Sequence, residues 1–368
     1  MTPHIVVLGA GYSGLIAAKL AARRTNATVT LVNERDRFVE RVRLHQLASG
    51  QSLRDLPLAD LLGGAGVRTV IGRVTEIDPD DRVVRVAGAD PLHYDQLIYA
   101  LGSRADLESV PGVAEHAYTV AGAEQAQRLR ERLEPGSGVV AVAGAWLTGI
   151  EAATELAESR PELKVLLLTA GQLGEALSER GRRHLRRVTD RLGIEVRAGA
   201  RVSEVRPDGL LLDDGSHLAA DTVVWTAGFQ VPDLAHAAGF AVDEHGRMIV
   251  DETLRSVSHP EVYGIGDAAA ARMPDGQELR MACATGIPSA PRAVGAVASR
   301  LAGKQPRPLR FRYFNQCISL GRRDALIQFV RADDSPVEAV LTGRLAVLYK
   351  ETIVRGALFV QRHPAMLK

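Results

Sequence analysis

Short apolar runs that end at glycine recur along the chain, and the first of them opens a compact unit. Residues 5–8 are uniformly apolar, which is typical of a strand buried on both faces of a parallel sheet. Residues 15–24 contain good helix formers and neither proline nor glycine, so we expect a helix there. Residues 28–32 are strand-like again. The three segments together predict one βαβ unit.

The same pattern returns in the middle of the chain. A strand is expected from residue 139, a helix over 149–159 and a strand over 164–168, which makes a second βαβ unit. The remaining expectations are apolar strands ending at glycine over 97–101, 223–227 and 262–265, short strands over 67–71 and 83–86, a helix over 287–301, and an irregular stretch over 35–66. From residue 306 onward the chain is strand-like and then amphipathic.

A glycine-rich loop connects the first strand to its helix. Gly9 permits the tight turn, Gly11 lets a pyrophosphate approach the backbone, and Gly14 allows the helix to pack closely on the strand. The N-terminus of that helix offers free N–H groups to an anion. Glu34 follows Gly14 by 20 residues, beside Asn33, and is placed to accept hydrogen bonds from a ribose. Because strand, loop, helix and acid agree, a dinucleotide site is favoured over a glycine turn with a surface acid.

The second loop departs from this pattern. Gly144 and Gly149 are present, but Trp146 stands where the middle glycine should be, and an indole there would obstruct the phosphates. The following strand runs into Thr169, with no acid for the ribose of NAD and no arginine for the extra phosphate of NADP. Two alternatives remain open: NAD(P)H binding is weak or absent, or Trp146 swings aside and the nucleotide still binds.

Composition narrows the possible functions. The net charge is +1, and the densest cationic run, over 180–187, falls in a predicted helix and reads as a solvated face, so nucleic-acid binding is not favoured. The chain shows no secretory signal and no apolar stretch of about 18 residues, so we expect a cytoplasmic protein. Cys283 and Cys317 form no CxxC pair, and no metal-ligand pattern is seen.

Five motifs in order carry a family resemblance over nearly the whole chain. They are residues 9–14, 99–103, 148–151, 225–228 and 263–267. With them the chain resembles the flavoproteins with two dinucleotide-binding domains, of the glutathione reductase type. The most similar members are the type II NADH dehydrogenases and the apoptosis-inducing-factor-like quinone reductases. The resemblance implies an α/β fold with two Rossmann-like domains and a small C-terminal α+β region. The implied domains are 1–105 with 245–305 for FAD, 106–244 for NAD(P)H, and 306–368.

The resemblance also implies the site. Asp267 would bind the ribityl chain and pyrophosphate of FAD, although an acid at that position also suits a helix N-cap. Arg43 could neutralise the pyrophosphate, and His45 and Glu151 are the candidate catalytic residues near the rings; simple packing of His45 and a helix-dipole role for Glu151 are the alternatives. The other implied FAD contacts are Gly9, Gly11, Tyr12, Ser13, Gly14, Asn33, Glu34, Val74, Ala100, Leu101, Gly102, Gly266 and Pro288.

Two further departures bear on the reaction. The segment over 38–47 has no cysteine pair, so disulfide chemistry is close to excluded, and residues 282–289 lack the two glutamines of the quinone-reducing relatives. The expected function is an FAD-dependent oxidoreductase that passes electrons from NAD(P)H to a quinone-like or other small organic acceptor. The alternatives are an FAD enzyme that acts directly on a small substrate, as an oxidase or a redox-neutral enzyme, and a non-catalytic flavin-binding protein.

The C-terminal segment over 340–362 is basic and amphipathic. Such a helix can lie on a membrane surface, in which case the protein would be peripheral on the inner membrane face. We favour the alternative in which it packs on the FAD domain or on the second subunit of a homodimer.

Overall fold

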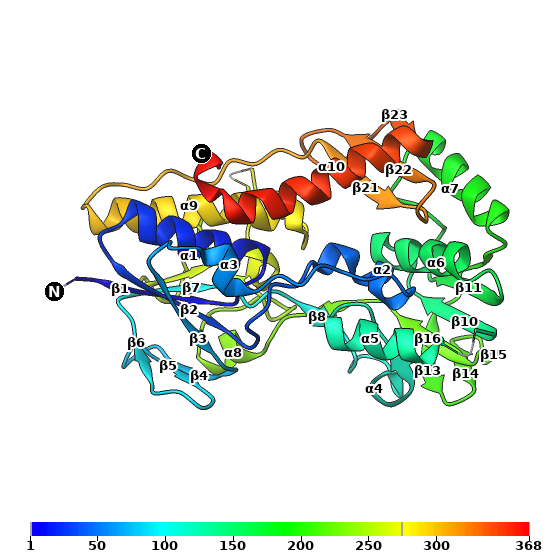
Figure 1. Cartoon of the computed structure of the whole chain (residues 1–368), viewed down its shortest axis with the longest axis horizontal. Coiled ribbons are helices and arrows are strands. Elements are labelled where there is room, and N and C mark those ends of the chain that lie inside the picture. Colours follow the sequence, from blue (N-terminus) through cyan, green and yellow to red (C-terminus); the bar gives the residue numbers. More distant parts are fainter. Residues whose placement is uncertain (1, 135, 274, 368) are drawn as a thin grey trace.

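The computed structural model describes residues 2–134, 136–273 and 275–367. Figure 1 shows two lobes, each built on one parallel sheet, with the last helix of the chain running above both. The prediction of an α/β fold with two Rossmann-like units is therefore confirmed.

The first lobe is built on a five-stranded parallel sheet with the strand order β19-β7-β1-β2-β3. The predicted apolar runs pair with one another, so that Ile5 lies opposite Val29 on one side and Gln96 on the other. The sheet is discontinuous in sequence: four of its strands precede the second lobe in the chain, and β19 follows it. The strands are β1 (His4–Leu8), β2 (Thr28–Asn33), β3 (Val67–Ile71), β7 (Gln96–Tyr99) and β19 (Val262–Gly264).

Two helices, α1 (Tyr12–Arg24) and α9 (Cys283–Leu301), pack against each other beside this sheet. Helix α9 begins four residues before the expected start at Ile287. The early start was hidden because Pro288 and Pro291 lie inside the helix, where each removes one backbone donor. The stretch expected to be irregular contains η1 (Arg41–Arg43), α2 (Leu44–Ala48) and α3 (Leu58–Leu62), which are too short to produce a clear periodicity.

The smaller elements of the first lobe surround the sheet. An antiparallel sheet of three strands follows β3, and a short pair accompanies β19. These elements are β4 (Val74–Asp78), β5 (Val83–Val86), β6 (Leu92–His93), α8 (Leu234–Ala237), β18 (Met248–Ile249), η2 (Gly266–Ala268) and β20 (Ala269–Ala270).

The second lobe repeats the arrangement with the parallel order β12-β11-β10-β16-β9. Helix α7 carries the arginine run, with its small and apolar residues buried and most of its arginines exposed. The elements are β9 (Ala117–Tyr118), β10 (Gly138–Ala143), β11 (Leu163–Thr169), β12 (Glu195–Ala198), β16 (Thr222–Trp225), α4 (Val113–His116), α5 (Ala123–Arg132), α6 (Leu147–Ser159), α7 (Glu179–Arg191) and the antiparallel β13 (Val202–Arg206), β14 (Gly209–Leu212) and β15 (His217–Ala219).

The chain crosses between the lobes twice, and the two crossings pair with each other. β8 (Arg104–Ala105) leads out of the first lobe and pairs antiparallel with β17 (Phe229–Gln230), which leads back. The backbone N–H of Asp106 also donates to Gly228 O at 3.3 Å. The crossings therefore form one short ribbon between the lobes.

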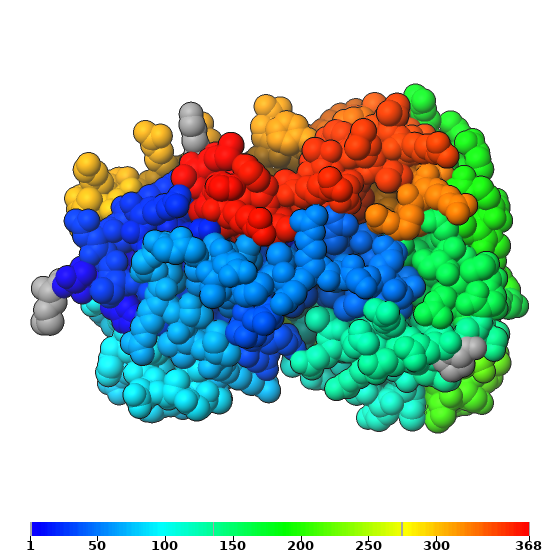
Figure 2. All heavy atoms as spheres, in the orientation of Figure 1, coloured from blue at the N-terminus to red at the C-terminus, as the bar shows by residue number. Residues whose placement is uncertain are grey.

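The C-terminal segment adds a sheet and a long helix that contact both lobes. β21 (Asn315–Ser319), β22 (Ala325–Val330) and β23 (Pro336–Thr342) are antiparallel, and α10 (Gly343–Arg362) and η3 (Pro364–Met366) follow. Figure 2 shows this segment covering the top of both lobes. The buried Lys19 of α1 holds the end of α10, because its ammonium group donates to Gln361 O at 2.9 Å and Arg362 O at 3.1 Å.

Candidate active site

The first glycine loop has room for a phosphate. Gly9 has a φ of +94°, and a Cβ at Gly14 would lie 1.8 Å from Gly9 O, so both positions require glycine. Gly11 is different, because its backbone is extended and a Cβ built on it meets nothing within 4 Å. That open space lies at the N-terminus of α1, where the residues fit a pyrophosphate.

The end of β2 offers an acid beside this space. Ala10 N donates to Asn33 Oδ1 at 2.8 Å, while Asn33 Nδ2 donates to Arg35 O at 2.7 Å. Asn33 thus holds the loop in place, and the neighbouring Glu34 is exposed. Val74 begins β4 close by and is buried. Glu34 is therefore the group that is free to accept hydrogen bonds from a ribose.

Asp267 follows Gly266, which lies against Ser13 in the first turn of α1. Its Oδ2 accepts from Ser103 Oγ at 2.7 Å and is 3.8 Å from Arg41 Nη1. Asp267 lies inside η2, and the N-cap of α9 is Ala282, so the alternative that Asp267 caps that helix is wrong. Ser13 packs closely against this turn, with its Oγ 2.8 Å from where a Cβ of Gly266 would be, so a side chain at position 266 has no room.

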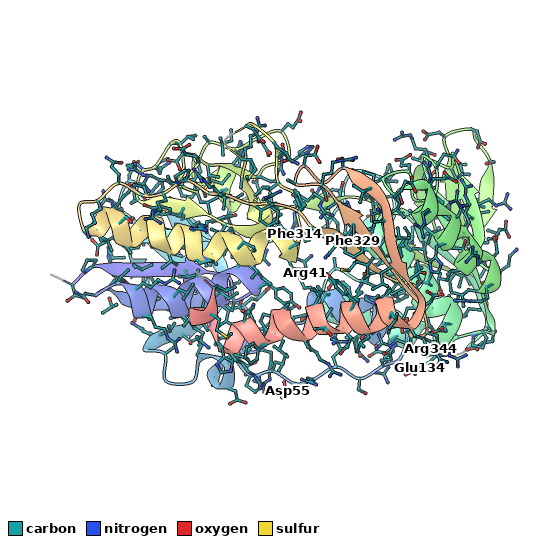
Figure 3. All side chains as sticks on the ribbon, turned by 90° about the horizontal axis from the view of Figure 1, so that it is seen from above. Arg41, Asp55, Glu134, Phe314, Phe329 and Arg344 are labelled. Atoms are coloured by element: carbon teal, nitrogen blue, oxygen red, sulfur yellow. The ribbon has the colours of Figure 1, made fainter. Side chains whose placement is uncertain are left out.

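Arg41, and not Arg43, faces Asp267. Arg43 is held by Glu351 at 2.7 Å and by Glu40 at 3.5 Å, so its guanidinium is already paired with two carboxylates. Figure 3 shows Arg41 between the ribbons of α9 and α10. Arg41, which the sequence analysis did not single out, is thus the guanidinium nearest Asp267, and the pyrophosphate role expected of Arg43 stays a prediction.

The remaining implied FAD contacts lie around α1, β7 and α9. Ala100, Leu101 and Gly102 follow directly after β7, and Gly102 has a φ of +68°. Tyr12 opens α1 and meets the Phe38 ring edge-on at 5.1 Å between centroids. Pro288 is half-buried in α9. These residues come from distant parts of the sequence, and the fold places them around the N-terminal ends of two packed helices.

Glu151 lies in the first turns of α6 and joins the second lobe to the C-terminal segment. Its Oε1 accepts from the Lys350 ammonium group of α10 and from Ser319 N at 2.9 Å. Burial opposes ionisation, but the charge of Lys350 prevails and holds the pKa of the Glu151 carboxyl below its usual value. Glu151 is therefore an ionised carboxylate in a nearly closed site.

His45 lies behind Glu151, away from the open space. It is 4 % exposed, with Nδ1 3.9 Å from Glu151 Oε2 and Nε2 4.0 Å from Glu155 Oε2. Burial lowers the pKa of His45 to about 4, so the ring is neutral at ordinary pH. The structure thus places His45 next to Glu151, and it adds Glu155, which the sequence analysis did not single out.

The second glycine loop copies the first except at its middle position. Gly144 has a φ of +104°, and a Cβ at Gly149 would lie 1.7 Å from Gly144 O, as in the first loop. Trp146 has φ −78° and ψ 179°, and its side chain is 63 % exposed. The backbone frame for a second nucleotide is therefore intact, and the indole projects from it toward solvent.

An acid does lie near the end of β11, contrary to the sequence expectation. The Glu175 carboxylate folds back over Gly171, so that a Cβ on Gly171 would lie only 2.3 Å from Glu175 Oε2. The same oxygen accepts a hydrogen bond from Gln172 N at 3.2 Å. Glu175 lines one pocket with Trp146 and Thr169. The acid was missed because it comes six residues after the strand and returns to it only through a turn.

Helix α10 has one face on the protein and one face in solvent. Ala346, Val354 and Leu358 are buried, whereas Leu345 and Leu348 are about two-thirds exposed, at 67 % and 65 %. Within the described ranges, no helix has the length and apolar character needed to cross a membrane. Contact of the exposed face with a membrane surface or a second subunit stays a prediction.

Comparison with known proteins identifies the family. The pyridine nucleotide-disulphide oxidoreductase family model matches residues 3–296. An NADH dehydrogenase-like protein of Mycobacterium tuberculosis is 33 % identical, over 88 % of this chain and 87 % of its own length. The demethylphylloquinone reductase of Synechocystis is 24 % identical, over 95 % and 92 %. The structure of NDH2 from Plasmodium falciparum in complex with NADH superposes with a TM-score of 0.83 at 15 % identity, covering 98 % of each chain.

Two glycine loops, each between a strand and a helix of a parallel sheet, are typical of oxidoreductases with two dinucleotide-binding domains. The chain belongs to the pyridine nucleotide-disulphide oxidoreductase family, and within it to the NADH dehydrogenase-like proteins. The family uses a flavin and a nicotinamide nucleotide. The predicted class of enzyme is thereby confirmed.

Proposed function

We propose that the chain binds FAD in the first lobe and NAD(P)H in the second, and passes electrons to a quinone-like acceptor. The observation that carries the proposal is the near identity of the two loops, because each has the strand, the turn and the helix N-terminus that a pyrophosphate needs. FAD, when bound, accepts two electrons and a proton from a reduced nicotinamide and passes the electrons on.

The protein residues have distinct parts in this function. Glu34 would bind the ribose of FAD, and Arg41 and Asp267 would bind its pyrophosphate and ribityl chain. Glu151 belongs to the second lobe and Asp267 to the first, yet the charges of both raise the pKa of the Cys283 thiol, after the larger effect of its burial. We therefore infer that electrons pass between the two cofactors near the N-terminus of α9.

Relatives support a quinone as the acceptor. The cyanobacterial relative is named a demethylphylloquinone reductase, and it aligns over nearly all of this chain. Residues 282–289 lack the two glutamines that the resemblance leads us to expect in quinone-reducing proteins. We therefore propose a quinone-like acceptor whose polar groups are met by other residues.

The test is anaerobic mixing of the purified yellow protein with NADH or NADPH, followed by addition of a soluble quinone. We expect the flavin absorbance to bleach and the quinone to restore it. A flavin that neither nucleotide bleaches would contradict the proposal and favour an enzyme acting directly on a small substrate. A flavin that NAD(P)H bleaches but no quinone reoxidises would support NAD(P)H as the electron donor and contradict a quinone as the acceptor.

A further inference from the structure

Two buried polar atoms face each other behind Glu151 without hydrogen bonds. In the part of the chain that the structure describes, His45 Nε2 and Glu155 Oε2 have no hydrogen-bond partner, and they are 4.0 Å apart. Glu155 is fully buried, and its other oxygen accepts from Gln51 Nε2. An unpaired buried nitrogen facing an unpaired buried oxygen is unfavourable unless a proton is shared between them.

The fold lines these groups up in one row. Glu151 and Glu155 are four residues apart on α6, so they project from one face of the helix. His45 comes from α2, which packs on that face, and its two ring nitrogens face the two glutamates. At one end Gln51 is half-buried and leads to solvent, and at the other Lys350 leads to the meeting point of the lobes.

We propose that Glu155 and His45 form a proton relay that carries protons from solvent to Glu151. This inference rests on the proposed function. A hydride brings two electrons and one proton, whereas reduction of a quinone to a quinol consumes two electrons and two protons. One proton in each turnover must therefore come from water, and the row from Gln51 to Glu151 gives it a path through the protein.

The transfer balances without any further reagent. The O–H bond of a neutral Glu155 breaks as its proton goes to His45 Nε2, and the proton on His45 Nδ1 goes to the Glu151 carboxylate. Glu151 passes the proton to the reduced quinone, Glu155 takes a new proton from solvent, and rotation of the His45 ring returns its N–H to the side of Glu151. The 4.0 Å gap closes to hydrogen-bond length with a movement of about 1 Å.

The charges around the relay hold its resting proton on Glu155 and keep Glu151 ionised, so the proton moves on only when a reduced, anionic quinone takes it from Glu151. Glu155 faces His45 and Gln51, the guanidinium of Arg322, and the carboxylates of Glu151 and Glu158. Burial raises the pKa of Glu155 to about 7, which lets it gain and lose a proton near neutral pH. His45 faces Glu151, Glu155 and the cations Lys350, Arg322 and Arg43, which favour a neutral ring that accepts a proton and passes it on.

The test compares two electron acceptors in each variant. Ferricyanide takes up electrons alone, whereas a quinone also takes up protons. For Glu155→Gln and for His45→Gln we expect the quinone-to-ferricyanide rate ratio to fall about tenfold, and its pH profile to lose the inflection near neutral pH. The matched control is Glu162→Gln, an exposed carboxylate just beyond the end of the same helix, which should keep the wild-type ratio.

A second measurement does not depend on turnover. Infrared difference spectra of the resting protein, between acid and alkaline pH, should show a protonated-carboxyl band near neutrality that Glu155→Gln removes. An unchanged ratio in a folded Glu155→Gln or His45→Gln protein, or a band that persists in Glu155→Gln, would overturn the relay. Should Glu155→Gln not fold, His45→Gln decides through its ratio. A wild type that oxidises NADH with neither acceptor would instead refute the proposed function.

Discussion

Gly11 and Trp146 occupy the same position in two copies of one loop and share one backbone conformation, with φ of −75° and −78°. Neither value lies in the left-handed region, so the position does not require glycine for its backbone. What distinguishes this position in the two loops is the presence of a side chain. The space beside Gly11 is open, and the corresponding place in the second loop carries an indole. Two substitutions in opposite directions follow from this relationship.

Gly11→Trp should abolish retention of FAD. The new side chain would fill the open space at the N-terminus of α1 that a pyrophosphate needs. The measurement is the ratio of flavin to protein absorbance after purification, with Gly11→Ala as the smaller substitution that should reduce the ratio only in part. Full occupancy in a folded Gly11→Trp protein would show that FAD binds elsewhere.

Trp146→Gly should raise the rate at which NAD(P)H reduces the flavin. Removing the indole opens the second phosphate site without changing its backbone, because Gly144 and Gly149 already hold the turn. A gain of about tenfold needs only ~1.4 kcal/mol, which relief of a steric block on a charged ligand can supply. Stopped-flow reduction checks this. A wild type that is already reduced as fast as the variant would mean that Trp146 moves aside.

Much of this architecture could be predicted from the sequence, because it rests on local patterns. The apolar strands and the three glycines of the first loop are contiguous signals, and both parallel sheets form where they indicate. The sequence analysis did not single out Arg41, because its proximity to Asp267 depends on which side of a short 3-10 turn each guanidinium projects from. Such a choice is decided by tertiary packing, which the spacing of residues does not encode.

The same limit explains two other residues that sequence reasoning did not find. Glu175 reaches the end of β11 only because the chain turns back at Gly174, which has a φ of +67°. In the sequence Glu155 is one of several glutamates on a helix, and only the packing of α2 on that face sets it apart. Both were hidden because their partners are defined by a turn or by a helix from another part of the chain.

Glu175→Gln should weaken NADH binding and reduce the preference for NADH over NADPH. The carboxylate near the strand end can accept hydrogen bonds from a ribose and repels an added phosphate. The amide retains an oxygen that accepts from Gln172 N, so the turn should persist. We expect about a tenfold change in the ratio of the two kcat/KM values, about 1.4 kcal/mol. The control is Glu179→Gln, because Glu179 is an exposed acid on α7. If the ratio of the two kcat/KM values is the same in the Glu175→Gln and Glu179→Gln proteins, Glu175 does not belong to the site.

Replacement of both cysteines by serine should leave turnover within a few-fold of wild type. Cys283 and Cys317 are free thiols, and burial raises the pKa of both, that of Cys317 to about 11. Neither is a thiolate at neutral pH, so neither is a good nucleophile. Steady-state rates of the double variant, with flavin content as the control, check this. A loss of several orders of magnitude with FAD still bound would establish thiol chemistry.

The stability of the protein should depend on pH through the buried Glu155 and His45, in opposite directions. The folded pKa of Glu155 is about 7, above its usual 4.5, so between these values the folded protein holds a proton that the unfolded chain has lost. Stability from this group therefore falls as pH rises through that window. The folded pKa of His45 is about 4, below its usual 6.5, so its contribution rises with pH between these values.

Single substitutions should separate the pH dependence of stability that comes from Glu155 from the one that comes from His45. As pH rises from 4.5 to about 7, Glu155→Gln should gain stability relative to wild type, by about 1 to 3 kcal/mol over the window, because an amide has no proton to lose. His45→Gln should lose stability relative to wild type as pH rises from about 4 to 6.5, because the unfavourable protonation that it removes acts only at the acid end. Thermal unfolding midpoints across a pH series measure both differences. Midpoint curves that run parallel for wild type and both variants would show that neither group changes its proton affinity on folding.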